Sequence, residues 1–310
     1  MEEFKKKIAV MLQEWLGGEY VIEPVSTLKA NDIVCDGITV RKEGSKTGIT
    51  MYLEGYFDRY NEGRIALSEI VELLVQNVSE DNLDHSRLEN TNVIANIADY
   101  DAVKESILMK VLNEDKNQEY LKDVVSVSTG LGICVCFYLE VDMQTNGTGS
   151  LAVRKRMLDI WGVTPEELYE QAQMNVTRLL PHKFEDIVDL KQRLVNRLRT
   201  VEELDLLMLP RNRMYVLSNE SSYHGAVSMF YTGLLRMLAE EIGTEHFIIL
   251  PSSLHEVLLL PLNPEEENTS YFREMVVEVN ATQIAPSEYL SDNIFHYDYV
   301  TDTISIIEEE

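Results

Sequence analysis

The sequence predicts an α+β fold with two lobes, and three observations support this prediction. The chain has 310 residues, which at roughly 150 residues per domain suggests about two domains. Apolar residues recur at helical spacing in some stretches and form short runs typical of strands in others. The C-terminal part follows the order strand, strand, helix, strand, strand, helix, which predicts a mixed or antiparallel sheet. We expect an N-terminal α+β lobe over residues 1–150, a helical connector over 151–213 and a C-terminal α+β lobe over 214–310.

The N-terminal lobe begins with an amphipathic helix that ends at a glycine pair. Its apolar residues recur every three or four positions from Phe4 to Trp15, and Gly17-Gly18 ends the run. Turn residues separate the elements that follow. These elements are strands over 20–25, 33–41 and 49–53 and a second helix over 67–78. The polar segment 80–92 is predicted to be a loop or a poorly packed helix.

The strongest strand signal in the chain is the run Ile133–Val141. This run is apolar on both faces as far as Glu140, which is typical of a central strand. Asn146-Gly147 then predicts a hairpin turn, after which residues 151–153 return as a strand. Two further strands are expected before the run, over 106–112 and 124–128.

The connector contains the clearest helix start in the sequence. Thr164 is an N-cap residue, Pro165 occupies the first helical position and Glu167 completes a capping box. Pro181 closes this helix, and residues 182–213 are predicted to be a further helix and a linker. The same region holds the most basic patch of the chain, formed by Lys191, Arg193, Arg197 and Arg199. We interpret this patch as an exposed helix face that does not bind nucleic acid, the alternative being a docking face for an acidic partner or for the protein's own acidic surface.

The C-terminal lobe is predicted from alternating apolar runs and helical stripes. A helix that begins at Thr232 carries an apolar stripe and is capped by Gly243. The other predicted elements are strands over 214–217, 226–231, 247–250 and 257–260, a helix over 265–279, and two closing strands over 294–299 and 303–307.

The charge of the chain argues against several classes of partner. With 27 Lys and Arg against 53 Asp and Glu, the formal net charge is −26. Phosphate backbones and anionic lipid surfaces both require basic protein surfaces, so we expect neither nucleic-acid binding nor membrane docking. No apolar run approaches the ~18 residues of a membrane span. Self-repulsion that favours solubility explains the charge, and an acidic mimic that inhibits a nucleic-acid enzyme is the alternative.

Cysteine usage and the N-terminus favour a reduced, cytoplasmic compartment. The three cysteines, Cys35, Cys134 and Cys136, are too few and odd in number for a disulfide framework. Cys134 and Cys136 are two apart on a predicted strand and so share one face, which suits buried free thiols. The first residues contain three lysines, but no continuous apolar segment of a signal peptide follows them.

The polar stretch Ser252–Glu256 holds the residue types of a hydrolytic site. Ser253, His255 and Glu256 are the candidate catalytic residues, yet triad members normally converge from separate elements. The G-x-S-x-G motif of a nucleophile elbow is missing from the sequence. We therefore interpret the stretch as a polar turn between two buried strands, in which the hydroxyls and His255 bond neighbouring groups.

The sequence predicts no metal site and no cofactor. His255-Glu256 starts a zincin motif, but Leu259 stands where the second histidine belongs. His255 with His224, His246 or His296 could still bind a metal, although no spacing supports this. The glycines of Thr129–Gly132 are too few for a dinucleotide loop, and a P-loop motif is missing from the sequence.

Several segments of the chain resemble an uncharacterised bacterial family. The matching segments are Asp36–Arg41, Tyr52–Tyr56, Asp159–Val163, Glu166–Tyr169, Met214–Asn219, His224–Ala226, Phe247–Val257, Asn280–Gln283 and Tyr289–Asn293. Over nearly its whole length the chain is similar to this domain of unknown function, which is abundant in anaerobic gut Firmicutes and often lies near mobile elements. The resemblance implies no activity. Members often carry a Pro-His pair where this chain has Asp123–Ser126, so a site built on that histidine would be missing here.

Together these observations predict a soluble cytoplasmic protein that binds or regulates rather than catalyses. A non-enzymatic function is expected because no catalytic template fits the sequence. The partner is unknown, and a protein is one candidate. The alternatives are a hydrolase centred on Ser253, His255 and Glu256, and the acidic mimic described above.

Overall fold

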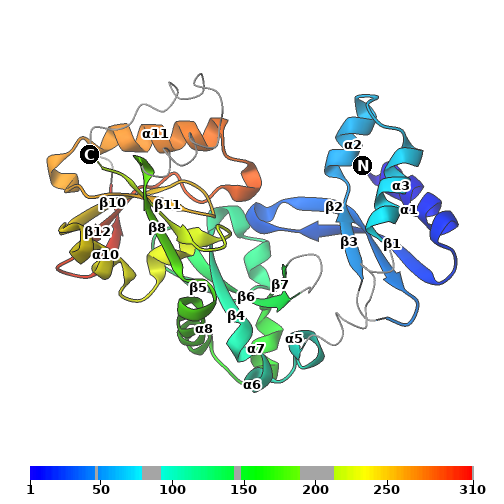
Figure 1. The fold of residues 1–310 in the computed structure, drawn as a ribbon, viewed down its shortest axis with the longest axis horizontal. Helices are drawn as coiled ribbons and strands as arrows, with labels where there is room; N and C mark the ends of the chain where they lie inside the picture. Colours follow the sequence, from blue (N-terminus) through cyan, green and yellow to red (C-terminus); the bar gives the residue numbers. More distant parts are fainter. Residues whose placement is uncertain (46–47, 79–91, 143–147, 189–212, 309–310) are drawn as a thin grey trace. The chain divides into compact units, whose positions relative to one another are not determined.

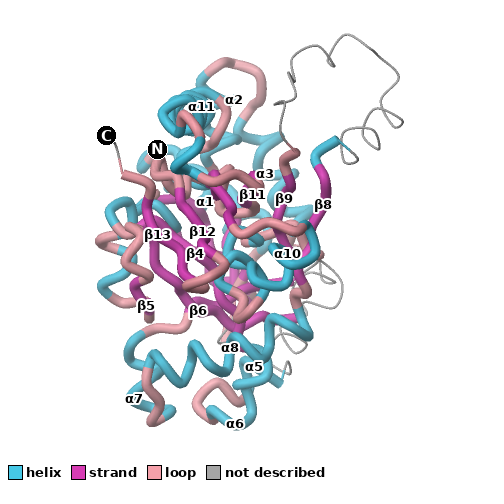
Figure 2. Tube along the Cα trace, turned by 90° about the vertical axis from the view of Figure 1, so that its left-hand side faces the viewer, coloured by secondary structure: helices cyan, strands magenta, loops and turns pink. Residues whose placement is uncertain are grey.

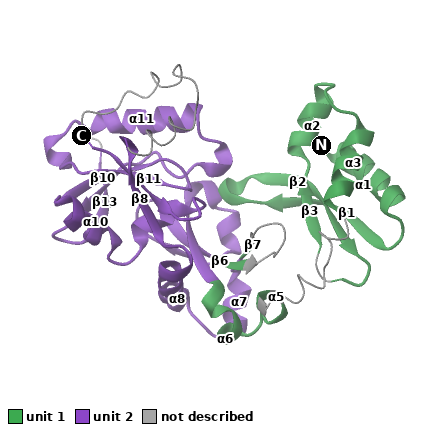
Figure 3. Ribbon diagram, viewed as in Figure 1, with its two compact units in different colours: residues 1–106, 139–151 green, residues 107–138, 152–310 purple. Residues whose placement is uncertain are grey.

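The computed structural model describes residues 1–45, 48–78, 92–142, 148–188 and 213–308. The chain divides into two compact units (Figure 3). Unit 1 comprises residues 1–106 and 139–151, and unit 2 comprises residues 107–138 and 152–310. None of the helices among the described residues is long and apolar enough to cross a lipid bilayer.

Unit 1 packs helices on a small antiparallel sheet. The sheet has the strand order β1-β2-β3. The elements of unit 1 are α1 (Glu2–Leu16), β1 (Tyr20–Leu28), β2 (Val34–Lys42), β3 (Ile49–Tyr52), α2 (Glu54–Asn61), α3 (Leu67–Asn77), α5 (Asn92–Ala95) and α6 (Tyr100–Val103). The apolar face of α1, with Ile8 and Leu12, is buried with Ile38 of β2 and Leu74 of α3. The predicted helices over 4–15 and 67–78 and the predicted strands over 20–25, 33–41 and 49–53 are confirmed to within a few residues, whereas α2, α5 and α6 were not predicted.

Unit 2 contains a short sheet that includes the predicted central strand. Its strands are β4 (Ile107–Asn113), β5 (Ser126–Ser128) and β6 (Ile133–Asp142), whose residues from 139 onward belong to unit 1. β7 (Thr148–Ala152), nearly all of which belongs to unit 1, pairs with β6. Cys134 and Cys136 share one buried face of β6, with their Sγ atoms 3.8 Å apart. The hydrogen bond from Cys134 and burial together raise the pKa of Cys136 well above its ordinary value. The Cys136 thiol is therefore held in the neutral, unreactive form.

The larger sheet of unit 2 is antiparallel and has six strands in the order β13-β12-β10-β11-β9-β8. Figure 2 shows β13 and β12 at one edge and β9 and β8 at the other. The strands are β8 (His182–Asp186), β9 (Tyr215–Asn219), β10 (His246–Pro251), β11 (Val257–Leu260), β12 (Phe295–Asp298) and β13 (Thr303–Ile306). This sheet confirms the predicted α+β class and the antiparallel alternative for the C-terminal lobe.

Two helices cover the larger sheet. α11 (Thr269–Thr282) lies along one face (Figure 1), where its Phe272 and Val276 pack against Ile248 and Ile294. Phe247 is buried on the opposite face. α10 (Leu234–Ile242) is linked to the end of β12, where its Arg236 donates a hydrogen bond to the Tyr299 carbonyl at 3.3 Å. The alternation of side chains along each strand therefore places residues 246, 248 and 250 of β10 on the α11 side.

α7 (Lys155–Trp161) is followed by α8 (Pro165–Leu179), which joins the two sheets of unit 2. The predicted cap is confirmed, since the Thr164 hydroxyl accepts a hydrogen bond from the Glu167 N–H at 3.2 Å. The buried Asn175 amide donates to the Ile107 carbonyl of β4 at 2.8 Å. On the other side, the Gln173 amide donates to the Phe230 carbonyl at 2.7 Å.

Two of the predicted elements are wrong. Residues 226–231, predicted as a strand, belong to the 3-10 helix η5 (Gly225–Phe230). Residues 182–186, predicted as helix or linker, form β8 instead and pair with β9 from His182–Asn219 to Asp186–Tyr215. β8 is an edge strand, where polar residues are usual, so its sequence lacks the apolar pattern of a strand. The basic patch at Lys191–Arg199 and the turn Asn146-Gly147 lie outside the described residues.

Candidate functional site

The stretch Ser252–Glu256 is the turn between β10 and β11, as predicted. The two strands form an antiparallel hairpin whose last pair is Pro251 with Val257. The backbone N–H groups of Ser252 and Ser253 both donate to the Glu256 carbonyl at 3.3 Å and close the loop. The Ser252 hydroxyl donates to the Glu256 carboxylate at 3.3 Å. The polar side chains of this stretch thus bond groups inside the turn.

Both ring nitrogens of His255 face polar groups of the protein. Its Nδ1 accepts a hydrogen bond from the backbone N–H of His224 at 3.1 Å, and its Nε2 lies 3.6 Å from a Glu288 carboxylate oxygen. The buried Ser253 hydroxyl accepts the backbone N–H of His255 at 3.0 Å. In a triad, Nδ1 donates to a carboxylate and Nε2 faces the nucleophile. The contacts of His255 differ from this pattern and fit the turn interpretation.

The turn is locked to β9 and η5 by close packing at Gly225. The Ser218 hydroxyl of β9 donates to the His255 carbonyl at 2.7 Å. A Cβ placed on Gly225 would lie 2.1 Å from the Ser218 Oγ and 2.5 Å from the His255 carbonyl oxygen. Only glycine allows this approach, so η5 can sit directly against the strand and the turn.

His224 is buried at the centre of this region in an uncommon backbone conformation. Its φ of 53° lies in the left-handed region. Its ring centroid is 4.0 Å from that of Tyr223 and 6.0 Å from that of Tyr138. Its Nδ1 atom is buried without a hydrogen-bond partner among the described residues. Burial, followed by the nearby Lys110 and His255, lowers the pKa of His224 to about 3, so its ring is neutral.

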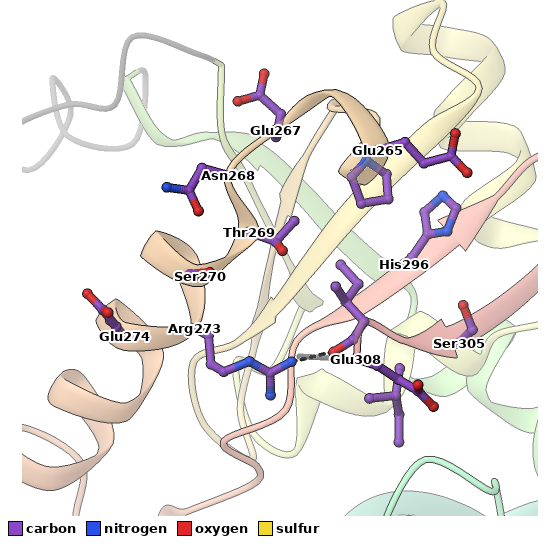
Figure 4. A pocket seen from close by; sticks show the side chains of 13 residues that line it. Glu265, Glu267, Asn268, Thr269, Ser270, Arg273, Glu274, His296, Ser305 and Glu308 are labelled. Atoms are coloured by element: carbon purple, nitrogen blue, oxygen red, sulfur yellow. Dashed lines mark hydrogen bonds between the residues drawn. The ribbon is translucent and has the colours of Figure 1, made fainter. Parts of the chain in front are cut away.

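A separate open groove lies on the other side of unit 2, between the N-terminal half of α11 and the end of β12 and β13. Its volume is about 700 Å³, and Figure 4 shows the side chains around it. Hydroxyl and amide groups line it, including Asn268, Thr269, Ser270 and Ser305. Its charged groups are the carboxylates Glu265, Glu267, Glu274 and Glu308 and the guanidinium of Arg273.

Arg273 reaches across the groove from α11 to the end of the chain. Its guanidinium donates a hydrogen bond to the Ile307 carbonyl (Figure 4). The only cation among the described lining residues, apart from the histidine, is therefore engaged with the protein's own backbone. The groove presents an excess of negative charge to solvent.

His296, which also lines the groove, belongs to a cluster with His246 and Asp298. The register of β10 and β12 pairs His246 with Asp298 and Ile248 with His296, so all three side chains project from the α11 face of the sheet. His246 Nδ1 lies 3.0 Å from His296 Nε2 and 3.9 Å from the Asp298 Oδ2. Burial, followed by the neighbouring His246, lowers the pKa of His296.

Asp298 is oriented by the turn that follows β12. The backbone N–H of Thr301 donates to the Asp298 Oδ1 at 2.8 Å, and the Thr301 hydroxyl donates to the same oxygen at 3.1 Å. These bonds lower the pKa of Asp298, with the backbone bond as the largest cause. The other carboxylate oxygen, Oδ2, lies 3.9 Å from His246 Nδ1 and is the oxygen that faces the cluster.

The histidines form two groups rather than one. The sequence allowed His255 to meet His224, His246 or His296; the residue lies beside His224, whereas His246 and His296 meet each other elsewhere. Asp298 was missed as a possible ligand. The available signal was the alternation His296-Tyr-Asp298, which puts both polar groups on one face of a strand. The contribution of His246 depends on strand register, which one sequence does not reveal.

Comparisons with known proteins identify one family. A family model described as "Family of unknown function (DUF5688)" matches residues 1–299. The chain therefore belongs to this family, as the sequence resemblance to a domain of unknown function suggested. The searches of curated proteins and of solved structures found no match.

Proposed function

We propose that this member of the DUF5688 family is a non-enzymatic binding protein whose ligand occupies the groove between α11 and β13. The observation that carries the proposal is the combination of a cavity of about 700 Å³ with four carboxylates at its rim. This volume lies within the range of roughly 300–1,000 Å³ that is usual for small-molecule sites. The polar lining suits a small, hydrophilic ligand.

The charges of the groove favour a ligand with positive charge. Four carboxylates face one guanidinium, and that guanidinium already donates to the Ile307 carbonyl. Each exposed carboxylate contributes only about 0.2–1 kcal/mol to an ion pair. Several acting together, within a chain of net charge −26, attract organic cations and repel anions. We expect weak, salt-sensitive binding of polyamine-like molecules.

The contacts of His255 support a binding function over the hydrolase alternative. The backbone N–H of His224 and the carboxylate of Glu288 face its two ring nitrogens. The proposed function therefore assigns Ser253, His255 and Glu256 a structural role in the turn. The hydrolase alternative predicts that a serine of this turn reacts with an activity-based probe.

A titration with spermidine tests the proposed function. The chain is first freed of metal and dialysed, and binding is followed by isothermal titration calorimetry. The double variant Glu265→Gln/Glu274→Gln removes two carboxylates of the groove, while Glu278→Gln removes an exposed carboxylate of α11 outside it. We expect the double variant to weaken spermidine binding at least about five-fold and Glu278→Gln to leave it unchanged.

Citrate serves as the anionic control in the same titration. Binding of citrate in preference to spermidine would contradict the proposed function. Absence of spermidine binding, or spermidine binding that the double variant leaves unchanged, would also contradict it. High salt should abolish the wild-type signal, because exposed charges are screened.

We also propose a cytoplasmic setting in anaerobic gut Firmicutes, with genes near mobile elements. The family resemblance and the three thiols of the chain support this setting. The acidic composition supports a protein partner over nucleic acid. Co-purification from such a host would identify that partner.

A further inference from the structure

Three side chains from two paired strands bring together the donor set of a transition-metal site. His246, at the start of β10, contributes an imidazole, and β12 contributes the imidazole of His296 and the carboxylate of Asp298. One potential ligand atom from each residue lies within 4.8 Å of the other two. We propose that His246, His296 and Asp298 bind a divalent first-row transition ion, for which Zn²⁺ is the probe.

The geometry of the cluster is close to that of a coordinated ion. Tetrahedral zinc with ligands at about 2.0–2.1 Å separates its ligand atoms by roughly 3.3 Å. The two ring nitrogens are 3.0 Å apart, and His246 Nδ1 is 3.9 Å from Asp298 Oδ2. A small rotation of Asp298, whose side chain is 28% exposed, closes the longer distance.

The cluster is preorganised by the elements around it. Paired β-strands hold the three Cα atoms, and rigid strands position ligands better than loops do. The Thr301 N–H and hydroxyl bind Asp298 Oδ1 and leave Oδ2 for the ion. Such bonds to the far oxygen of a carboxylate ligand are the usual support of a metal site.

The donor atoms select the class of ion. Two imidazoles with one carboxylate suit Zn²⁺ and its first-row neighbours, whereas Mg²⁺ and Ca²⁺ prefer oxygen ligands alone. Three protein ligands leave a fourth position for an exchangeable group. His296 also lines the groove, as does Glu265, so the cluster borders the proposed ligand site (Figure 4). The inference rests on the proposed function in one respect, namely that the groove is a ligand site.

Competition with a chromogenic zinc chelator tests the site in the full chain after metal removal. We expect one Zn²⁺ per chain in the wild type and at least about ten-fold weaker binding in His246→Ala and Asp298→Asn. His182→Ala is the matched control, because His182 is a partly exposed strand histidine of β8 outside the cluster. Mg²⁺ in excess should fail to displace Zn²⁺ from the wild type.

Circular dichroism melting verifies that each variant folds, and His246→Gln replaces His246→Ala if the smaller side chain prevents folding. Absence of stoichiometric Zn²⁺ in the wild type overturns the inference. So does equal loss of zinc in His182→Ala, or unchanged binding in His246→Ala.

The two proposals fail in different ways. His246 is outside the groove lining, and Glu274 is outside the cluster. Zinc binding without spermidine binding leaves the metal site and removes the proposed ligand class. Spermidine binding without zinc binding supports the proposed function and overturns the metal site.

Discussion

Acidification should destabilise unit 2 through His224, and the size of the effect follows from its burial. The pKa of His224 is about 3 in the folded chain, against about 6.5 for an unperturbed histidine. The unfolded chain therefore binds the proton first as the pH falls. The stabilisation is complete above about pH 6.5 and is lost progressively between about 6.5 and 3. At about pH 5, some 1.5 units below the unfolded value, the loss is about 2 kcal/mol at 1.36 kcal/mol per unit.

The groups that face His224 also disfavour protonation of its ring. Lys110 of β4 and His255 of the turn both disfavour a second positive charge, and the rings of Tyr138 and Tyr223 keep water away. The protonated ring would also remain without a hydrogen-bond acceptor at Nδ1 among the described residues. A charge buried in this way is costly, so the folded chain binds this proton only at a much lower pH than the unfolded chain does.

Urea denaturation measures this effect separately for unit 2. The chain has two tryptophans, Trp15 in unit 1 and Trp161 in unit 2, so Trp15→Phe leaves a single reporter for unit 2. In this background, His224→Phe keeps a ring between the tyrosines but does not titrate. We expect the parent to lose about 2 kcal/mol more than His224→Phe between about pH 7.5 and pH 5. Equal losses, within about 0.5 kcal/mol, would refute the reasoning. His224→Asn tolerates the positive φ and repeats the comparison.

Three further predictions concern the turn and the packing around it. Gly225→Ala should lower the free energy of unfolding of unit 2 by about 2–3 kcal/mol, because the added Cβ meets Ser218 and the His255 carbonyl. Gly55→Ala on α2 is the control: open space surrounds this position, so the substitution should cost nothing and can raise the free energy of unfolding by up to about 1 kcal/mol. Urea denaturation measures both variants. His255→Ala should cost about 1–3 kcal/mol, since it leaves the His224 N–H without its acceptor. A serine-hydrolase probe followed by mass spectrometry should leave Ser253 unmodified, and labelling that His255→Ala abolishes without lowering the melting temperature would restore the hydrolase alternative.

Local sequence signals predicted the elements whose stability is local. α8 begins at Pro165, as the N-cap at Thr164 and the capping box of Glu167 indicated. The turn at Ser252–Glu256 lies between two runs too apolar to be exposed, and the structure places it there. In these cases propensity, pattern and packing favour the same structure.

Elements that depend on tertiary contacts were predicted less well. Residues 226–230 are apolar enough for a strand, but β9 is paired on both sides, by β8 and β11, and η5 is buried against it through Gly225. β8 is polar because it is an edge strand, and its pairing with β9 decides its conformation. The predicted lobe boundaries at residues 150 and 213 stay a prediction.

The candidate site shows the same division between local and tertiary information. Ser253, His255 and Glu256 are neighbours in sequence and were easy to single out. His246 lies fifty residues before His296, and only the register of β10 and β12 brings them together. The charge of the groove comes from two segments, 264–274 and 305–308, that meet because α11 packs on the sheet.

Histidine-selective NMR is the most direct test of where the chain binds its ligands. The chain has six histidines, and their ring resonances can be assigned by single substitutions. On addition of one equivalent of Zn²⁺ to the metal-free chain, we expect the His246 and His296 ring signals to shift and those of His224 and His255 to stay unchanged. Shifts at His224 and His255 instead, or unchanged spectra of all the histidines, would contradict the placement of the site at the end of β10 and β12.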